Sequence, residues 1–219
     1  MAIVITGANR GIGRGLRDLF TERGDTVVGT TRGEMPEEAG HWVTVDLQKP
    51  EAFAHLASEL DSVTVDLLVC NAGVYLDKGM KLADGYAHDV WDTSFSVNVT
   101  AVFLTIQALL PNLQMSDAPR IAIISSAMGS TDRAPGGSYA YRASKAAVTN
   151  LGRNLARDLE PLGIAVGVYH PGWVQTDMGG SAAELTLDQS LHGLAARFDE
   201  LSLAKTGTVV SYNGETVPF

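Results

Sequence analysis

TGANRGIG, residues 6–13, follows directly on the apolar run AIVI, residues 2–5, and leads into an amphipathic stretch, residues 11–23. A short β-branched run, a glycine-rich turn and a helical stretch together make a strand–turn–helix unit. Glycines in such a turn allow a tight bend and let backbone N–H groups approach a phosphate at the positive end of the helix. The stretch therefore predicts a dinucleotide-binding turn, with an ordinary structural turn as the alternative. The residues expected to contact the dinucleotide here are Thr6, Gly7, Asn9, Arg10, Gly11, Ile12 and Gly13.

The alternation of strands and helices continues to the end of the chain. Short runs rich in Val, Ile and Leu are typical of buried parallel strands, and they lie at residues 2–6, 26–30, 42–45, 65–70, 120–125, 164–169 and 208–211. Helical stretches lie between them at residues 11–23, 50–60, 91–113 and 138–160. This pattern predicts one α/β domain, residues 1–219, with a Rossmann-type, doubly wound parallel sheet of about seven strands and helices on both faces.

Composition narrows the range of partners. Of the 219 residues, 45% are hydrophobic, and 25 acidic residues against 16 basic ones give a net charge of −9. That charge argues against nucleic acid or an anionic membrane as the main partner. The chain has one cysteine, which excludes an intrachain disulfide, and we find no apolar run of about 18 residues and no basic leader. We therefore expect a soluble, acidic, cytoplasmic globular protein.

The end of the second expected strand bears on the choice of cofactor. Folds that bind NAD usually carry an acid there, which accepts hydrogen bonds from the ribose hydroxyls. This sequence has Thr30-Thr31-Arg32 instead, and an arginine suits a 2′-phosphate, which it can bind through two hydrogen bonds. Arg10 adds a second positive charge in the glycine turn, although either arginine can also be a plain surface charge. The pattern predicts NADP(H) in preference to NAD(H).

Tyr141 and Lys145 form a Y-x-x-x-K pattern in the expected helix 138–160, which places them one turn apart on one face. Reduction of a carbonyl by hydride leaves an alkoxide that must gain a proton. A free tyrosine has a pKa near 10, and a nearby ammonium group favours its anion. Lowering that pKa to near 7 takes on the order of 4 kcal/mol. The pair is thus a candidate acid/base group with its activator.

Further motifs follow in a fixed order. Asn71-Ala72-Gly73 ends the fourth expected strand, Asn98 lies in the stretch 91–113, Ser126 follows the fifth strand, and residues 171–176 read PGWVQT. Together with TGxxxGxG and YxxxK, this order resembles the short-chain dehydrogenase/reductase (SDR) family over nearly the whole chain. Residues 139–142, 170–174, 176–180 and 211–214 look most similar to sniffer-type carbonyl reductases and C-factor-like bacterial proteins.

The resemblance implies a catalytic set of Asn98, Ser126, Tyr141 and Lys145. Ser126 would polarise a substrate carbonyl, with Ser125 as the alternative, and Tyr141 would be the acid/base group. Lys145 would lower the pKa of Tyr141 and hold the nicotinamide ribose. Asn98 would support a water relay; its alternative role is that of a buried polar residue at a helix irregularity.

The resemblance also extends the cofactor site beyond the glycine turn. Asp46 would accept a hydrogen bond from the adenine amino group; its alternative role is to cap the helix that follows Pro50. The loop after the sixth strand would contact the nicotinamide carboxamide. The full set implied outside the turn is Arg32, Asp46, Leu47, Asn71, Ala72, Gly73, Tyr141, Lys145, Pro171, Gly172, Val174 and Thr176.

The region after PGWVQT is short, which predicts a small substrate lid near residues 177–205 and an open site that accepts several carbonyl compounds. Family members often self-associate, so a homodimer or homotetramer is expected. The five histidines and Cys70 show no spacing typical of metal ligands, and no metal is expected. Two other functions stay open: a nucleotide-binding regulatory or signalling protein on the same scaffold, and a methyltransferase, which has no use for YxxxK.

Overall fold

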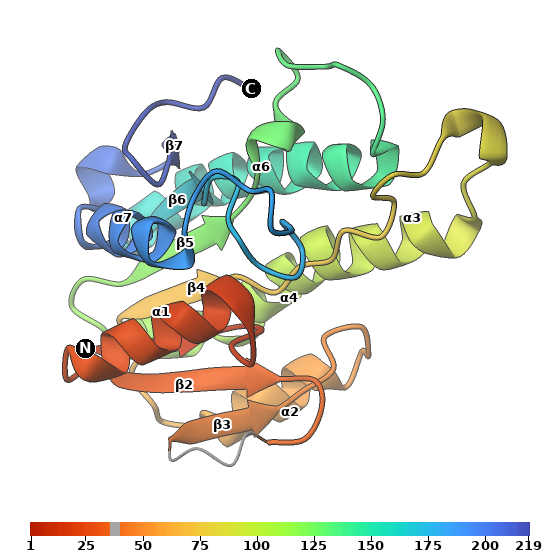
Figure 1. Cartoon of the computed structure of the whole chain (residues 1–219). Coiled ribbons are helices and arrows are strands. Elements are labelled where there is room, and N and C mark those ends of the chain that lie inside the picture. The colour runs from red at the N-terminus through yellow and green to blue at the C-terminus, as the bar shows by residue number, and fades with distance from the viewer. Residues whose placement is uncertain (36–39) are drawn as a thin grey trace.

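The computed structural model describes residues 1–35 and 40–219, and its centre is one parallel sheet (Figure 1). All seven predicted strands are confirmed, each within a few residues of its expected position. They are β1 (Ala2–Ile5), β2 (Thr26–Thr31), β3 (His41–Thr44), β4 (Leu67–Cys70), β5 (Arg120–Ile124), β6 (Ala165–His170) and β7 (Val209–Ser211).

The strand order is β3-β2-β1-β4-β5-β6-β7, and every neighbouring pair is parallel. In the centre, Val4 of β1 lies between Val28 of β2 and Leu68 of β4. The order reverses between β1 and β4, and a doubly wound sheet binds its ligand at the carboxyl ends of the strands beside that point. The predicted fold class is thereby confirmed.

Helices cover both faces of this sheet (Figure 1). The α-helices are α1 (Gly11–Glu22), α2 (Ala52–Glu59), α3 (His88–Phe95), α4 (Ala101–Ala108), α5 (Leu110–Gln114), α6 (Tyr139–Leu159) and α7 (Leu187–Asp199). A π-helical turn, η2, spans Ser96–Thr100, and short 3-10 turns are η1 (Leu82–Asp84), η3 (Ala127–Gly129), η4 (Glu160–Leu162) and η5 (Leu203–Lys205).

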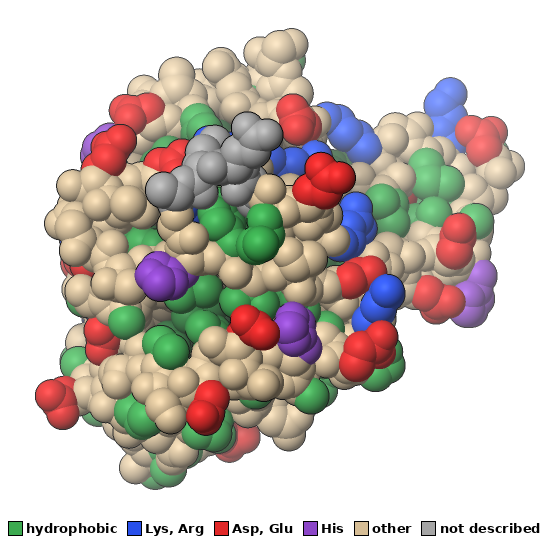
Figure 2. Space-filling view, turned by 90° about the horizontal axis from the view of Figure 1, so that it is seen from below, with side chains coloured by type: hydrophobic (Ala, Val, Ile, Leu, Met, Phe, Trp, Pro, Cys, Tyr) green, Lys and Arg blue, Asp and Glu red, His purple; other side chains and the backbone are tan. Residues whose placement is uncertain are grey.

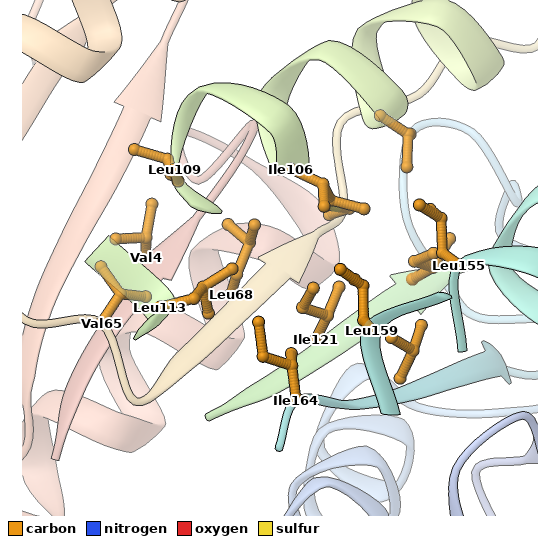
Figure 3. Packing of buried hydrophobic residues seen from close by; sticks show 14 of the residues in the cluster. Val4, Val65, Leu68, Ile106, Leu109, Leu113, Ile121, Leu155, Leu159 and Ile164 are labelled. Carbon is orange, nitrogen blue, oxygen red and sulfur yellow. The ribbon is translucent and has the colours of Figure 1, made fainter. Parts of the chain in front are cut away.

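One face of the sheet packs against α2, α4 and α6 (Figure 3). Ile106 of α4 and Leu159 of α6 are buried there with Leu68 of β4 and Ile121 of β5. Each fully buried aliphatic side chain contributes about 1.5–3 kcal/mol to folding. This packing fixes α6, the helix with the Y-x-x-x-K pattern, against the middle of the sheet.

The other face packs against α1 and α7. Leu16 and Phe20 lie one turn apart on α1 and are fully buried together with Leu194 and Phe198 of α7. The sequence did not predict α7, because its residues lie inside the segment expected to form a lid. Thr186 and Gln189 form a capping box at its start. The part of the expected lid before this helix is residues 177–186.

The single helix expected at residues 91–113 is the main correction to the predicted elements. The chain instead forms α3, the π-helical turn η2, α4 and α5 in succession. The π-helical turn contains Asn98, whose side chain bonds outside its own helix. Pro111, which has no N–H to donate, lies in the first turn of α5, and the α-helical pattern is broken at Leu109.

On the face shown in Figure 2, acidic side chains are spread over the surface, whereas the Lys and Arg side chains lie mainly on the right of the view. No described helix combines the length and the apolarity needed to span a membrane.

Candidate active site

The glycine turn between β1 and α1 has the shape of an anion cradle. Gly7 and Gly11 adopt positive φ angles of 65° and 54°, which L-residues with side chains rarely adopt. Helix α1 begins with no capping side chain, and its first turn contains no acidic residue. Its first N–H groups and the positive end of its dipole are therefore available to an anion. These residues fit the pyrophosphate of a dinucleotide.

Gly13 allows α1 to approach the sheet closely. A methyl group at this position would lie 2.3 Å from the carbonyl oxygen of Gly7 and 2.4 Å from Nδ2 of Asn71. The first of these atoms belongs to the backbone of the turn itself, so a side chain here requires the turn to move. Gly13 thus sets the geometry of the cradle.

Asn71 joins the loop after β4 to the turn after β1. Its Nδ2 donates to the carbonyl oxygens of Thr6 (2.9 Å) and Gly7 (3.1 Å). In return, Oγ1 of Thr6 accepts from the backbone N–H groups of Asn71 and Ala72, both at 3.0 Å. Thr6 and Ala72 also line a small hollow with Leu47, which the sequence placed in the cofactor site. The two loops on either side of the β1–β4 switch point are therefore held as one unit.

Both arginines of the predicted phosphate site are exposed. Arg32 directly follows β2, and Nη1 of Arg10 lies 3.4 Å from a carboxylate oxygen of Asp177. The interpretation of Asp46 as a helix cap is wrong, because the N-cap of α2 is Glu51. The Asp46 carboxylate instead accepts from the N–H of Gln48 at 3.2 Å.

Tyr141 and Lys145 lie on the first two turns of α6, as the sequence predicted, and both are buried, at 7% and 5% exposure. Nζ of Lys145 is 5.8 Å from the centre of the Tyr141 ring and donates to the carbonyl oxygen of Ile124 at 2.9 Å. Burial raises the pKa of Tyr141 to about 12 and lowers that of Lys145 to about 8. In the protein alone, burial thus outweighs the lowering of the Tyr141 pKa that the sequence analysis expected.

The two serines after β5 have different environments. The hydroxyl of Ser126 lies near the Tyr141 phenol and lowers its pKa, and Oγ of Ser126 accepts from the N–H of Met128 at 3.1 Å. Ser125 is buried in the protein, where its Oγ bonds Thr149 at 2.7 Å and the carbonyl oxygen of Lys145 at 3.1 Å. Of the two candidates, Ser126 is the one that faces Tyr141.

Asn98 uses its side chain within the protein. Its Oδ1 accepts from the N–H of Val74 at 2.8 Å, and its Nδ2 donates to the carbonyl oxygen of Val74 at 3.0 Å and to Oγ of Ser144 at 2.9 Å. Asn98 is thus a buried polar residue at a helix irregularity, which is the role that the sequence analysis offered as the alternative to a water relay. A methyl group on Gly73 would lie 3.2 Å from Oδ1 of Asn98 and 3.5 Å from Nζ of Lys145, so both side chains converge on Gly73.

The loop after β6 approaches the glycine turn. A methyl group on Gly11 would lie 3.7 Å from Cγ2 of Thr176, and Oγ1 of Thr176 accepts from the N–H of Gly179 at 3.1 Å. Gly172 has a φ of 87° and packs against Leu185. The carbonyl oxygen of Pro171 accepts a hydrogen bond from the hydroxyl of Ser190 in α7. The side chain of Val174 is buried. The predicted nicotinamide loop thus lies beside the predicted phosphate turn.

The sequence analysis missed Asp77 as a residue of the site. Asp77 is fully buried in the loop after β4, and its carboxylate accepts from the backbone N–H groups of Ala140 and Tyr141. Local rules for helix caps point to Ser138 instead, but the side chain of Ser138 makes no capping bond. Nearby, the rings of Tyr75 and Tyr141 stack with their centres 4.2 Å apart.

Among the described residues, no cluster of His, Cys, Asp and Glu is arranged to bind a metal ion. The site consists of hydroxyl, phenol, amine and amide groups at the carboxyl edge of β4, β5 and β6.

Comparison with known proteins agrees with this geometry. The family model described as short chain dehydrogenase matches residues 1–185. The C-signal protein of Myxococcus xanthus is 40% identical over 159 residues, which cover 71% of this chain and 93% of that protein. Carbonyl reductase Sniffer of Drosophila melanogaster superposes with a TM-score of 0.91 at 27% identity, covering 100% of this chain and 99% of that one. An NADPH-bound carbonyl reductase from chicken fatty liver gives a TM-score of 0.89 at 26% identity, covering 100% and 98%. The resemblance expected from the motifs is confirmed, and the chain is an oxidoreductase of the short-chain dehydrogenase/reductase family.

Proposed function

We propose that the protein is an NADP(H)-dependent carbonyl reductase in which Tyr141 is the acid/base group. The observation that carries this proposal is the grouping of Ser126, which lowers the pKa of Tyr141, with the amine of Lys145, which lies 5.8 Å from the centre of the tyrosine ring. These groups lie at the carboxyl edge of the sheet, where the loops joined by Asn71 offer a phosphate cradle. The NADPH-bound chicken enzyme and a Burkholderia multivorans relative with bound NADP, whose structure gives a TM-score of 0.87, support the cofactor assignment.

The groups that bind the cofactor, and the two hydroxyl groups that act on the substrate, have defined tasks in this scheme. When bound, the nicotinamide supplies or takes the hydride and, when oxidised, adds a positive charge beside Tyr141. The N–H groups at the start of α1 bind the pyrophosphate, while Arg32 and Arg10 bind the 2′-phosphate. Ser126 donates a hydrogen bond to the carbonyl oxygen as negative charge develops there. Tyr141 then transfers its proton to that oxygen, and its raised pKa keeps the phenol protonated at neutral pH until this step.

Consumption of NADPH against a panel of aldehydes and ketones, with NADH in parallel, tests the proposal directly. We expect turnover of several compounds, because the segment that can cover the site before α7 is short. Absence of turnover with every compound and both cofactors would overturn the proposal. If one substrate had a kcat/KM far above that of all others, the expectation of an open site would be refuted, but the reductase activity would not.

The similarity to the M. xanthus C-signal protein favours one other candidate function, that of a cofactor-binding signalling protein. Such a protein needs the phosphate cradle but not the grouping of Ser126, Tyr141 and Lys145. The two functions therefore differ in whether Tyr141 is required for anything beyond folding.

Replacement of Arg32 by aspartate tests the cofactor preference. The carboxylate repels a 2′-phosphate and accepts hydrogen bonds from free ribose hydroxyls, so R32D should shift the NADPH/NADH ratio of kcat/KM at least about tenfold toward NADH. The matched control is R23D, which carries the same change of charge at the far end of α1, where Arg23 pairs with Asp199. An unchanged ratio in R32D would refute the role of Arg32.

Replacement of Ser126 by alanine tests the carbonyl donor. We expect kcat to fall about 10²–10³-fold, as for loss of one oxyanion donor. Because Ser126 lowers the pKa of Tyr141, loss of its hydroxyl should raise that pKa. The rise of alcohol oxidation with pH, which needs the phenolate, should therefore move to higher pH.

Ser125 provides the control for this experiment. S125A loses buried hydrogen bonds to Thr149 and to the Lys145 carbonyl, so it should lower stability by about 1 kcal/mol without moving the pH profile. If S125A and not S126A moved the profile, the assignment of the two serines would be reversed.

A further inference from the structure

Asp77 lies outside every motif of the site, yet it holds the helix that carries Tyr141. Its carboxylate is fully buried and comes from the loop after β4, 63 residues before Ala140. Oδ2 accepts from the N–H of Ala140 at 2.8 Å, and Oδ1 accepts from the N–H of Tyr141 at 3.3 Å. These two N–H groups belong to the first turn of α6, where an α-helix has no partners of its own for them.

No side chain next to α6 in the sequence can replace this contact. Ser138, the N-cap residue, adopts a left-handed conformation with a φ of 48° and makes no side-chain cap. Its hydroxyl instead bonds the hydroxyl of Tyr75 at 2.6 Å. The first turn of α6 also contains no acidic residue. The start of the helix therefore depends on a negative charge supplied from another part of the chain.

The loop that supplies this charge is itself fixed on the other side. Asn98 holds Val74 through both its N–H and its carbonyl oxygen. Tyr75 follows and stacks on the Tyr141 ring at an interplanar angle of 21°. Three contacts thus connect the π-helical turn with Tyr141. Asn98 binds Val74, Tyr75 stacks on the Tyr141 ring, and Asp77 accepts from the backbone N–H of Tyr141.

We propose that Asp77 is a positioning residue that fixes Tyr141 for proton transfer by capping α6 through tertiary contacts. The proposal rests on the role of Tyr141 in the proposed function. It goes beyond a structural cap because the capped N–H is that of Tyr141 itself and the carboxylate charge acts on the phenol.

The charge gives the proposal a distinctive readout. The groups that face the Tyr141 phenol are Lys145 on the same helix, Ser126 after β5, and Tyr75 and Asp77 in the loop after β4. Burial raises the pKa of Tyr141 most, Tyr75 also raises it, and the negative charge of Asp77 raises it further. Its removal should therefore lower that pKa, and the rise of alcohol oxidation with pH should move to lower pH, opposite to the shift expected for S126A.

The experiment compares D77N and D77A with wild type in the full-length protein. D77N removes the charge but keeps one acceptor oxygen, so it should shift the pH profile downward with a loss of kcat below about tenfold. D77A also removes the cap, and because small misplacements of a reacting group are costly, its kcat should fall about 10–10²-fold. The Kd for NADPH should stay within about twofold of wild type in both variants.

Asp66 offers a matched control at the opposite end of the sheet. Its carboxylate also accepts from a backbone N–H, that of Ala2 at 2.8 Å, and from a hydroxyl, that of Ser116 at 2.6 Å. D66N and D66A should lower stability without moving the pH profile. A shift of the profile in D66N equal to that in D77N, or no shift in D77N, would overturn the proposal.

Amide hydrogen exchange separates a failure of this proposal from a failure of the proposed function. Exchange of the peptide that contains the N–H groups of Ala140 and Tyr141 should accelerate in D77A and not in D66A, whether or not the protein turns over a carbonyl. Unchanged exchange in D77A overturns the capping role. If D77A does not fold, D77N provides the same measurement with a smaller acceleration. If the wild-type protein turns over no carbonyl, the proposed function is overturned. Faster exchange in D77A but not in D66A would still establish the tertiary cap.

Discussion

Tyr141→Phe should reduce kcat for carbonyl reduction by about 10²–10⁴, the range expected for loss of a general acid. Phenylalanine keeps the ring, which stacks on Tyr75 with its centre 4.2 Å away, and keeps the backbone N–H that Asp77 binds. Only the phenolic hydroxyl, the group whose pKa Ser126 lowers, is removed. NADPH should therefore bind as in wild type, with a Kd changed by less than about twofold.

Steady-state kinetics and fluorescence titration with NADPH measure these two quantities on the same preparation. Tyr75→Phe is the matched control, because it removes a phenol hydroxyl that bonds Ser138 rather than a substrate. Turnover in Y141F close to wild type would refute the acid/base role. A wild-type protein that binds NADPH equally well but turns over no carbonyl would favour the signalling function instead.

Gly13→Ala should weaken cofactor binding strongly. Its methyl group would meet the carbonyl oxygen of Gly7 at 2.3 Å and Nδ2 of Asn71 at 2.4 Å. Relief of both contacts moves the turn away from α1 and breaks the bonds that Asn71 makes to it. Overpacking of this kind costs about 1–3 kcal/mol, and we expect the Kd for NADPH to rise about 10–10²-fold.

Gly24→Ala is the control, because Gly24 lies just beyond the other end of α1. It has a φ of 85°, and no heavy atom lies within 4 Å of the position that a methyl group would take there. The change should cost about 1 kcal/mol of stability through backbone strain and leave the Kd for NADPH unchanged. Thermal unfolding with and without NADPH separates the two effects, since only G13A should lose the rise in Tm caused by the cofactor. A full rise in G13A would contradict the assigned role of Gly13.

The sheet could be predicted from the sequence because its strands are buried on both faces. Runs such as Leu67–Cys70 and Ala165–His170 are apolar almost throughout. This pattern identifies a buried strand even when the strands next to it in the sheet are not known. The same holds for the glycine turn and for Tyr141 with Lys145, whose spacing alone places them on one helix face. The family motifs added Ser126, whose contact with Tyr141 no local pattern reveals.

The parts that could not be predicted depend on contacts between distant segments. The π-helical turn at Asn98 forms where the side chain reaches Val74, and the pattern of residues 91–113 contains no trace of that partner. The cap of α6 comes from Asp77, whereas local rules point to Ser138. Helix α7 differs from these two, because its start has a local signal: Thr186 and Gln189 have the spacing of a capping box.

The arrangement of the sheet has a consequence for how the chain reaches its native state. β1 is flanked by β2 and β4, and Val4 finds its second neighbour only at Leu68. Because all neighbouring strands are parallel, none of them is joined by a hairpin. Each pairing closes a long loop, so conformational entropy is lost before the contacts between the strands can compensate for it. During synthesis, β1 can therefore pair with β2 at an early stage, but it can pair with β4 only after β4 has left the ribosome. The region at the carboxyl ends of β1 and β4 can therefore form only after β4 has been synthesised, although β1 is the first strand of the chain.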